Sequence, residues 1–320
     1  MSVPAEKSPE AAYLEVAHAV GNLLLEQLDR ICRKHDIPYF VGGGTLIGTL
    51  RERGWIPWDD DIDITMFRDD YERFRVIAPQ ELPDEVQFTD ARSNPQQLSS
   101  IPRLMYMPSE RTPYERERVF RPIEAQHVVL DIFILDVAPP HPVIRRLWPG
   151  VIKVFELMIV GRAMSARHAL AAEKSPRTAA LAVVAASRLL SAKRWKALHF
   201  AACTGPARVW GRRTANPTVS FANDFKQYVR RIPLSPDVFF PARTGQFEHL
   251  QVSVPARAEA LLERVYGDWR TPPAHPEVPH LRTGVTVTLE GTRWMFRADS
   301  VTSEPISPPD AHQEDLGPRK

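Results

Sequence analysis

The sequence has few cysteines, no long hydrophobic run and almost no net charge. Two cysteines among 320 residues, Cys32 and Cys203, make neither a disulfide framework nor a metal cluster, so we expect buried thiols in a reducing compartment. No uncharged stretch approaches the ~20 residues that a membrane span needs. The N-terminal residues lack a basic-then-apolar leader pattern. We therefore expect a cytoplasmic protein, with room for a peripheral contact at the inner face of the membrane.

The net charge of +2 conceals an uneven distribution. Between residues 143 and 216 there are 14 lysines and arginines and only two acidic residues, whereas the rest of the chain holds 27 basic and 37 acidic residues. A basic segment on an acidic body indicates that the two parts meet different partners.

Apolar periodicity predicts alternating helices and strands. Helical spacing covers residues 11–35, and strand-like patterns cover 61–67 and 127–137. Shorter helices are expected at 45–54 and 68–79, the second ending at a proline. Mixed elements of this kind favour an α/β (α+β) fold with a helical insertion. The predicted division is a core of 11–140 and 217–300, a basic helical insertion at 141–216, and disordered tails at 1–10 and 302–320.

The segment WDDDIDI places four carboxylates within five residues. Side chains on a strand alternate between faces, so Asp59, Asp61 and Asp63 share one face if the strand is regular that far back. Asp60 then points away or lies in the turn. Such carboxylates can converge on divalent cations. A third ligand is expected from Asp131, because a lone carboxylate within an apolar strand is costly unless a cation meets it.

The acidic run could instead be a solvated loop or a calcium-binding loop. Acidic runs in general are more often solvated loops, but here the alternation with isoleucine and the downstream Asp131 favour a metal site. A calcium loop of the EF-hand type is disfavoured, because the glycine at its sixth position and the glutamate at its twelfth are missing.

A glycine turn, GGGT at 42–45, lies where a strand hands over to a helix. Glycines allow backbone N–H groups to approach a phosphate, and a helix N-terminus favours an anion. Thr45 is a candidate cap of that helix. The turn has neither the lysine of a Walker A loop nor the glycine spacing of a dinucleotide site. Paired with the acidic run, it indicates a nucleotidyl- or phosphoryl-transfer site.

Three motifs together resemble the LicD family of phosphotransferases, relatives of fukutin and fukutin-related protein. The first is GGGTLIGTLRERGWIPWDDDIDI, the second is VVLDIFILD, and the third runs from FFPARTGQF to VYGDWRTPP. The resemblance covers roughly 15–140 and 238–275. Where the family has proline after DIF, this chain has Ile134, and the basic insertion has no counterpart in the resemblance.

The resemblance implies a nucleotidyltransferase-like mixed sheet flanked by helices and transfer of a phospho-alcohol from a CDP-activated donor to a glycan. The implied donor-phosphate contacts are Gly43, Gly44 and Thr45, with Arg51 and Arg103 as further phosphate or pyrophosphate contacts. The implied ligands of Mg²⁺ or Mn²⁺ are Asp59, Asp61, Asp63 and Asp131. Asp61, Asp63 and Asp131 form the implied catalytic set, Asp131 serving as metal ligand or as general base toward the acceptor hydroxyl.

Two further functions compete with this one. A nucleotidyltransferase that moves a nucleoside monophosphate to a small molecule or RNA shares the same active-site physics. A non-catalytic glycan- or membrane-binding protein on the same fold is the alternative from another class. The basic insertion is either a solvated face or a contact with anionic membrane or a lipid-linked glycan. Nucleic acid is an unlikely partner, because no recognised binding motif accompanies the charge.

Overall fold

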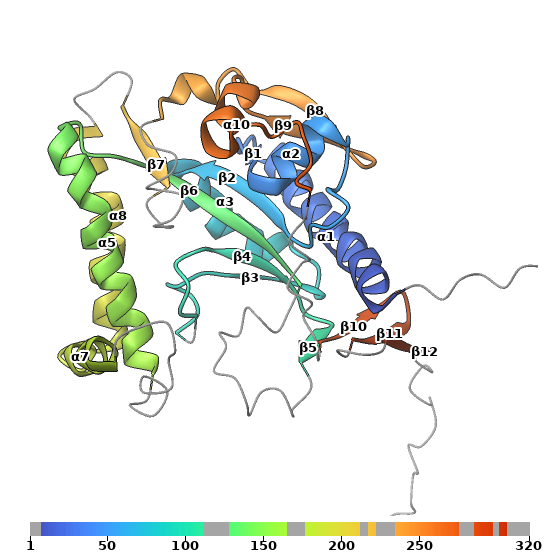
Figure 1. Cartoon of the computed structure of the whole chain (residues 1–320), viewed down its shortest axis with the longest axis horizontal. Coiled ribbons are helices and arrows are strands. Elements are labelled where there is room, and N and C mark those ends of the chain that lie inside the picture. The colour runs from blue at the N-terminus through green and yellow to red at the C-terminus, as the bar shows by residue number, and fades with distance from the viewer. Residues whose placement is uncertain are drawn as a thin grey trace, which may run out of the picture.

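A computed structural model of the chain describes residues 8–95, 97–111, 128–164, 177–211, 217–221, 234–274, 285–296 and 301–305. Figure 1 shows a central sheet with helices around it, a set of helices standing beside one end of the sheet, and two smaller sheets at other edges. The predicted α/β (α+β) fold with a mixed sheet flanked by helices is therefore confirmed.

The central sheet carries both parallel and antiparallel pairs. Its order is β1 (Phe40–Val41), β2 (Ile62–Phe67), β6 (Val129–Val137), β4 (Arg103–Tyr106) and β3 (Val86–Thr89), and β7 (Val219–Phe221) pairs with the far end of β6. β2 and β6 run parallel, whereas the other neighbours are antiparallel. A central strand needs cover on both faces, which explains the nearly continuous apolar sequence of β6.

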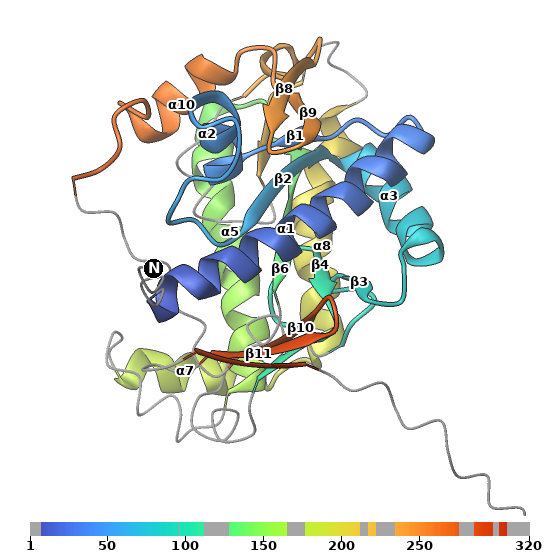
Figure 2. The same cartoon turned by 90° about the vertical axis from the view of Figure 1, so that its right-hand side faces the viewer.

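Three helices surround this sheet: α1 (Pro9–Lys34), α2 (Gly43–Arg51) and α3 (Arg68–Glu81). Ser8 caps α1, since its hydroxyl accepts the Ala11 N–H at 3.3 Å, and Pro9 occupies the first helical position. α1 crosses the face that holds Ile62, where Gly21 allows close approach. Figure 2 shows α1 running across this face of the sheet.

Smaller elements follow at the C-terminal side. β8 (Arg243–Phe247) and β9 (Leu250–Val254) form an antiparallel hairpin, and α10 (Ala258–Tyr266) ends at Gly267. A short 3₁₀ turn, η3, spans Pro236–Val238. β10 (Val285–Leu289) and β11 (Thr292–Phe296) form another hairpin, which joins β12 (Val301–Pro305) and β5 (Ser109–Arg111) in a second sheet.

The basic segment contains three described helices: α5 (Pro142–Ala163), α7 (Arg177–Ser187) and α8 (Ala192–Trp210). α5 contacts both of the others, and α8 also contacts β6. Residues 165–176 and 212–216, which carry part of the predicted basic charge, lie outside the described residues. Among the described helices, none combines the length and apolarity needed to cross a membrane.

Several predicted boundaries were wrong. α1 begins at Pro9 and β12 extends to Pro305, so the predicted disordered tails overlap ordered elements; residues 1–7 and 306–320 lie outside the described part. α3 continues past Pro79 to Glu81, because a proline near a helix end removes only one hydrogen bond. β2 starts at Ile62 rather than Asp61, which changes the arrangement of the acidic run.

The junction between α8 and the core holds buried polar groups. Arg68 donates to both carboxylate oxygens of Asp136, at 2.8 and 2.7 Å, and Asp136 is fully buried. This ion pair ties β6 to α3, a role that the sequence analysis did not assign to either residue. His199 of α8 is also buried, and desolvation together with the nearby Arg68 charge lowers its pKa to about 4.

We expect His199 to make the protein less stable in mild acid. The imidazole takes up its proton near pH 6.5 in the unfolded chain but only near pH 4 in the folded chain, so the unfolded state binds more protons in that interval. The free energy of unfolding should therefore fall by up to about 3 kcal/mol as the pH drops through it. Urea denaturation of wild type and His199→Gln at pH 7, 5.5 and 4 measures this difference.

The matched control is His141→Gln, since His141 is exposed and its side chain makes no capping hydrogen bond to α5. The difference from wild type should change with pH for His199→Gln and much less for His141→Gln. If the His199→Gln profile also runs parallel to wild type, the buried histidine does not cause the acid sensitivity.

Candidate active site

A row of charged side chains crosses three neighbouring strands. The register of β2 and β6 places Asp63 directly beside Asp131, and the register of β6 and β4 places Arg103 on the other side of Asp131. Neighbouring strands lie about 4.8 Å apart, and paired residues share a face. The Arg103 guanidinium donates to both Asp131 oxygens, the contact from Nη2 measuring 3.2 Å. The predicted pairing of the two acidic strands is thus present.

The glycine turn lies against the same face. Gly42 N–H donates to the Asp63 carbonyl at 2.9 Å, and Asp63 N–H donates to the Thr45 hydroxyl at 2.9 Å. Gly43 has φ of +49°, and a Cβ at this position would lie only 1.7 Å from Asp63 Oδ2. Glycine is therefore required both for the left-handed backbone and for the close approach of the carboxylate.

The first turn of α2 approaches a second carboxylate as well. A Cβ on Gly44 would lie 2.0 Å from Asp59 Oδ2, so this glycine too is needed for space. The first N–H groups of a helix have no acceptor within the helix and favour negative charge. The prediction that Thr45 caps the helix was wrong: Gly42 is the N-cap residue, and the Thr45 hydroxyl instead holds β2 in place.

The three consecutive aspartates form a cluster before the strand begins. Asp59, Asp60 and Asp61 each offer a carboxylate oxygen within 4.8 Å of the other two, and all three are half-buried. Burial raises the pKa of the Asp59 carboxyl to about 7, and the charges of Asp61 and Asp60 add to the shift. Asp60 therefore lies in the turn, the second of the two placements that the sequence allows, because β2 begins only at Ile62.

Residues of α1 hold this acidic turn. The Tyr13 hydroxyl donates to Asp60 Oδ2 at 3.1 Å, and His18 Nε2 lies 2.8 Å from the Asp59 carbonyl oxygen. The His18 ring also stacks on Trp55, with ring centroids 4.2 Å apart and planes inclined by 12°. The turn is thus positioned by a helix far away in the sequence. Sequence reasoning missed these supports, because periodicity does not show which polar face of a helix meets which loop.

The donor set fits a hard divalent cation. Mg²⁺ and Mn²⁺ prefer carboxylate oxygens, and the acidic turn and the Asp63–Asp131 pair supply them from adjacent segments. Burial and the repulsion from Asp61 and Asp60 both raise the pKa of the Asp59 carboxyl, and a bound cation would offset this cost of ionisation. The group of closely spaced oxygens comprises Asp59, Asp60 and Asp61, so two of the predicted ligands lie in it beside Asp60, whereas Asp63 and Asp131 lie outside it.

Arg51 lies at the opposite end of α2 from the glycine turn. Its Nη1 donates to the Trp269 carbonyl at 2.9 Å, its Nε donates to Glu52 at 2.7 Å, and its guanidinium lies 5.9 Å from the centre of the Trp58 ring. Arg51 Nη2 and Trp269 Nε1 are buried donors with no acceptor among the described residues. Arg51 belongs to the first sequence motif and Trp269 to the third, so the two motifs are in contact here. An anion or a water molecule could accept hydrogen bonds from their two unsatisfied donors.

A small pocket adjoins the glycine turn. It measures about 10 Å³, is lined by Gly42, Gly43, Thr65 and Tyr266 among others, and has room for about one water molecule. The predicted site residues Gly43, Asp63, Asp131 and Arg103 come together on the face of the carboxylate row; Arg51 does not join them.

Comparisons with known proteins agree with the sequence motifs. Residues 36–115 match the family model described as LicD/FKTN/FKRP, nucleotidyltransferase domain. A lipopolysaccharide cholinephosphotransferase LicD of Haemophilus influenzae is 53% identical over 51 residues, 16% of this chain and 19% of the relative. Uncharacterised proteins of Rickettsia typhi and Rickettsia prowazekii are 39% and 37% identical over 57 residues, 18% of this chain and 18% and 21% of those relatives.

The family-model match covers the segment that holds the glycine turn and the acidic run. The predicted resemblance to the LicD family is confirmed for residues 36–115 by this model, and the Haemophilus relative carries the same family name. The matched stretch spans about a fifth of the length of each of these curated relatives.

Proposed function

We propose that this protein is a phosphotransferase of the LicD kind. It would use a metal to move a phospho-alcohol, such as phosphocholine, ribitol phosphate or glycerol phosphate, from a CDP-activated donor to a glycan hydroxyl. The observation that carries the proposal is the convergence of Asp63, Asp131 and Arg103 with the acidic turn and the N-terminus of α2. The similarity to a cholinephosphotransferase LicD over 51 residues supports it.

In this proposal Asp59, Asp61, Asp63 and Asp131 hold Mg²⁺ or Mn²⁺, and the structure adds Asp60 as a neighbour. When bound, the cation supplies charge neutralisation for the phosphate oxygens of the donor. Gly43 and Gly44 present the helix N-terminus to the diphosphate.

Two arginines have different roles in the proposal. Arg103 orients the Asp131 carboxylate, which acts as metal ligand or as general base toward the acceptor hydroxyl. The unsatisfied donors of Arg51 and Trp269 mark a second place for anionic oxygens at the far end of α2.

The experiment that tests this proposal is a screen of CDP-choline, CDP-ribitol and CDP-glycerol for release of CMP. Each donor is tested with Mg²⁺, with Mn²⁺ and with a chelator, and with mono- and oligosaccharide acceptors. Metal-dependent CMP release from one donor supports the proposal. Incorporation of a nucleotide from an NTP, with no CMP release, supports the nucleotidyltransferase alternative. Neither activity, together with retained glycan or vesicle binding, supports the non-catalytic alternative.

The proposed acceptor is a glycan or lipid-linked glycan, met in the cytoplasm at an anionic membrane surface. α5 exposes Val143, Ile144, Leu147 and Val151, with Leu147 67% exposed, and exposed Arg146 lies among them. An apolar helix face flanked by cations suits the interface of an anionic bilayer. Flotation with anionic and neutral vesicles tests this: Leu147→Ser with Val151→Ser should lose anionic-vesicle binding, and exposed Val76→Ser should not. Equal binding to both vesicles, or none, would remove the idea.

A further inference from the structure

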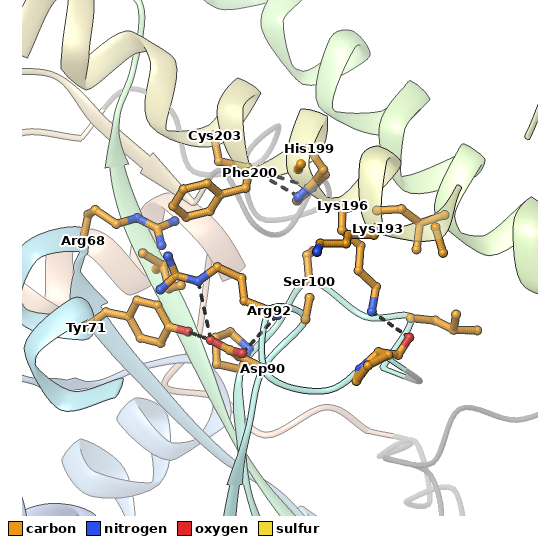
Figure 3. A pocket seen from close by; sticks show the side chains of 18 residues that line it. Arg68, Tyr71, Asp90, Arg92, Ser100, Lys193, Lys196, His199, Phe200 and Cys203 are labelled. Atoms are coloured by element: carbon orange, nitrogen blue, oxygen red, sulfur yellow. Dashed lines mark hydrogen bonds and ion pairs between the residues drawn. The ribbon is translucent and has the colours of Figure 1, made fainter. Parts of the chain in front are cut away.

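A cavity of about 540 Å³ lies between the basic insertion and the core. Its walls come from α3, the segment 90–102, Ile134 of β6, Ile159 of α5 and the first half of α8 (Figure 3). Ile134 is three residues beyond Asp131 on β6 and therefore points to the opposite face of the sheet. The cavity is thus separated from the carboxylate row by the sheet itself. Its volume lies within the range of about 300–1,000 Å³ that is usual for small-molecule sites.

Most of the wall is hydrocarbon. Leu98, Pro102, Ile134, Ile159 and Phe200 line it together with several alanines. The polar groups of its inner part already have partners: the Tyr71 hydroxyl donates to Asp90 at 2.8 Å, and Arg68 is committed to Asp136. His199 is neutral near pH 7, because burial lowers its pKa to about 4. A hydroxyl-rich ligand such as a sugar would leave its polar groups unpaired against this wall.

The remaining charge is positive and comes from α8. Lys196 Nζ donates to the carbonyl oxygens of Asn94 and Pro95, at 3.0 and 2.9 Å, which are neutral acceptors. Lys193, in the first turn of α8, is exposed and has no ion-pair partner among the described residues. In Figure 3 both lysines lie on the side of the cavity away from Arg68 and Tyr71. The cavity therefore has an apolar interior and a cationic edge.

We propose that this cavity binds the hydrocarbon chain of an anionic amphiphile, with its carboxylate or phosphate group at Lys193. An apolar ligand body gains by leaving water, and the anionic end gains a cation without having to displace an existing ion pair. The site is distinct from the proposed active site, and the proposal does not depend on the transferase activity.

The test uses the full chain and the fluorescent fatty acid cis-parinaric acid, titrated by fluorescence. Oleate and dodecyl phosphate serve as competitors that distinguish a carboxylate from a phosphate end. Oleyl alcohol tests the need for charge, and inorganic phosphate tests the need for a chain. We expect competition by both anionic amphiphiles, weaker competition by the alcohol and none by inorganic phosphate.

Matched variants locate the binding. Lys193→Glu should weaken it about fivefold or more, whereas Arg194→Glu, on the same helical turn but outside the lining, should leave it unchanged. Ala197→Trp should block the cavity, and Ala201→Trp, one turn further along and also exposed, should not. Equal effects within either pair, or competition by the alcohol equal to that by oleate, would overturn the proposal. No binding of the probe by wild type would do the same.

Discussion

Replacing Asp61 and Asp63 together by asparagine is expected to abolish divalent metal binding and to lower turnover by on the order of 1,000-fold or more. Asparagine keeps the shape of each side chain but removes the charge that a cation requires. Asp61 belongs to the clustered acidic turn, and Asp63 connects that turn to Asp131 on the next strand. Calorimetric titration with Mn²⁺ gives the direct measurement, and CMP release in the donor screen gives the second.

The matched control removes two exposed acids elsewhere. Asp84→Asn with Glu85→Gln changes the net charge by the same amount in the turn between α3 and β3, and both metal binding and turnover should persist. Unchanged metal binding in the Asp61/Asp63 variant would show that the site is misplaced. Loss of metal binding in the control as well would show that the effect is one of overall charge.

The thermal stability of the same double variant shows whether Asp61 and Asp63 serve to bind a metal or to hold the fold together. Burial and the neighbouring Asp61 charge raise the pKa of Asp59, so near neutral pH the ionised cluster opposes folding. In the presence of a chelator we therefore expect the variant to melt at the same temperature as wild type or higher. A large decrease in Tm under these conditions would mean that Asp61 and Asp63 act mainly as structural hydrogen-bond acceptors.

Gly43→Ala is expected to have the second largest effect. A left-handed backbone costs a non-glycine residue roughly 1–2 kcal/mol. The new Cβ would in addition lie 1.7 Å from Asp63 Oδ2, so the carboxylate must move. Together these effects should destabilise the fold by about 2–4 kcal/mol and disrupt Asp63, with a corresponding loss of metal affinity. Urea denaturation and Mn²⁺ calorimetry measure the two consequences separately.

Gly150→Ala is the control for this substitution. Gly150 lies within α5, and a Cβ there would meet nothing within 4 Å. The change should stabilise the helix by roughly 0.5–1 kcal/mol, because alanine loses less backbone entropy than glycine. If Gly43→Ala proves as harmless as Gly150→Ala, the close contact between the glycine turn and Asp63 does not exist.

The two acidic strands could be predicted because the pattern of apolar and charged residues within each strand is enough to identify it. Ile62 and Ile64 alternate with Asp63, and Asp131 is a charged residue inside an apolar run, so the local pattern of each strand marks a carboxylate that needs a polar partner. That these strands pair in parallel with Asp63 beside Asp131 follows from packing, which no local pattern determines.

The conformation of the acidic turn could not be predicted from the alternation of apolar and charged residues. The alternation places Asp59 on the face of Asp61 and Asp63 only if the strand extends back that far, and β2 begins at Ile62. Ahead of the strand the chain turns, and Asp60 lies in that turn with its carboxylate close to those of Asp59 and Asp61. The turn has this shape because Tyr13 and His18 of α1 hold it, and those contacts join residues that are distant in the sequence.

By itself the sequence determined the mixed α/β class, the helical character of the basic segment, and the residue types of the proposed phosphate- and metal-binding site. These depend on periodicity, turn chemistry and charge, which act over a few residues. Only the tertiary structure decided that Arg103 pairs with Asp131, that Arg51 lies away from the glycine turn, and that α8 closes a cavity on the other face of the sheet. Such contacts form only when segments distant in the sequence pack together, so no short stretch of the chain predicts them.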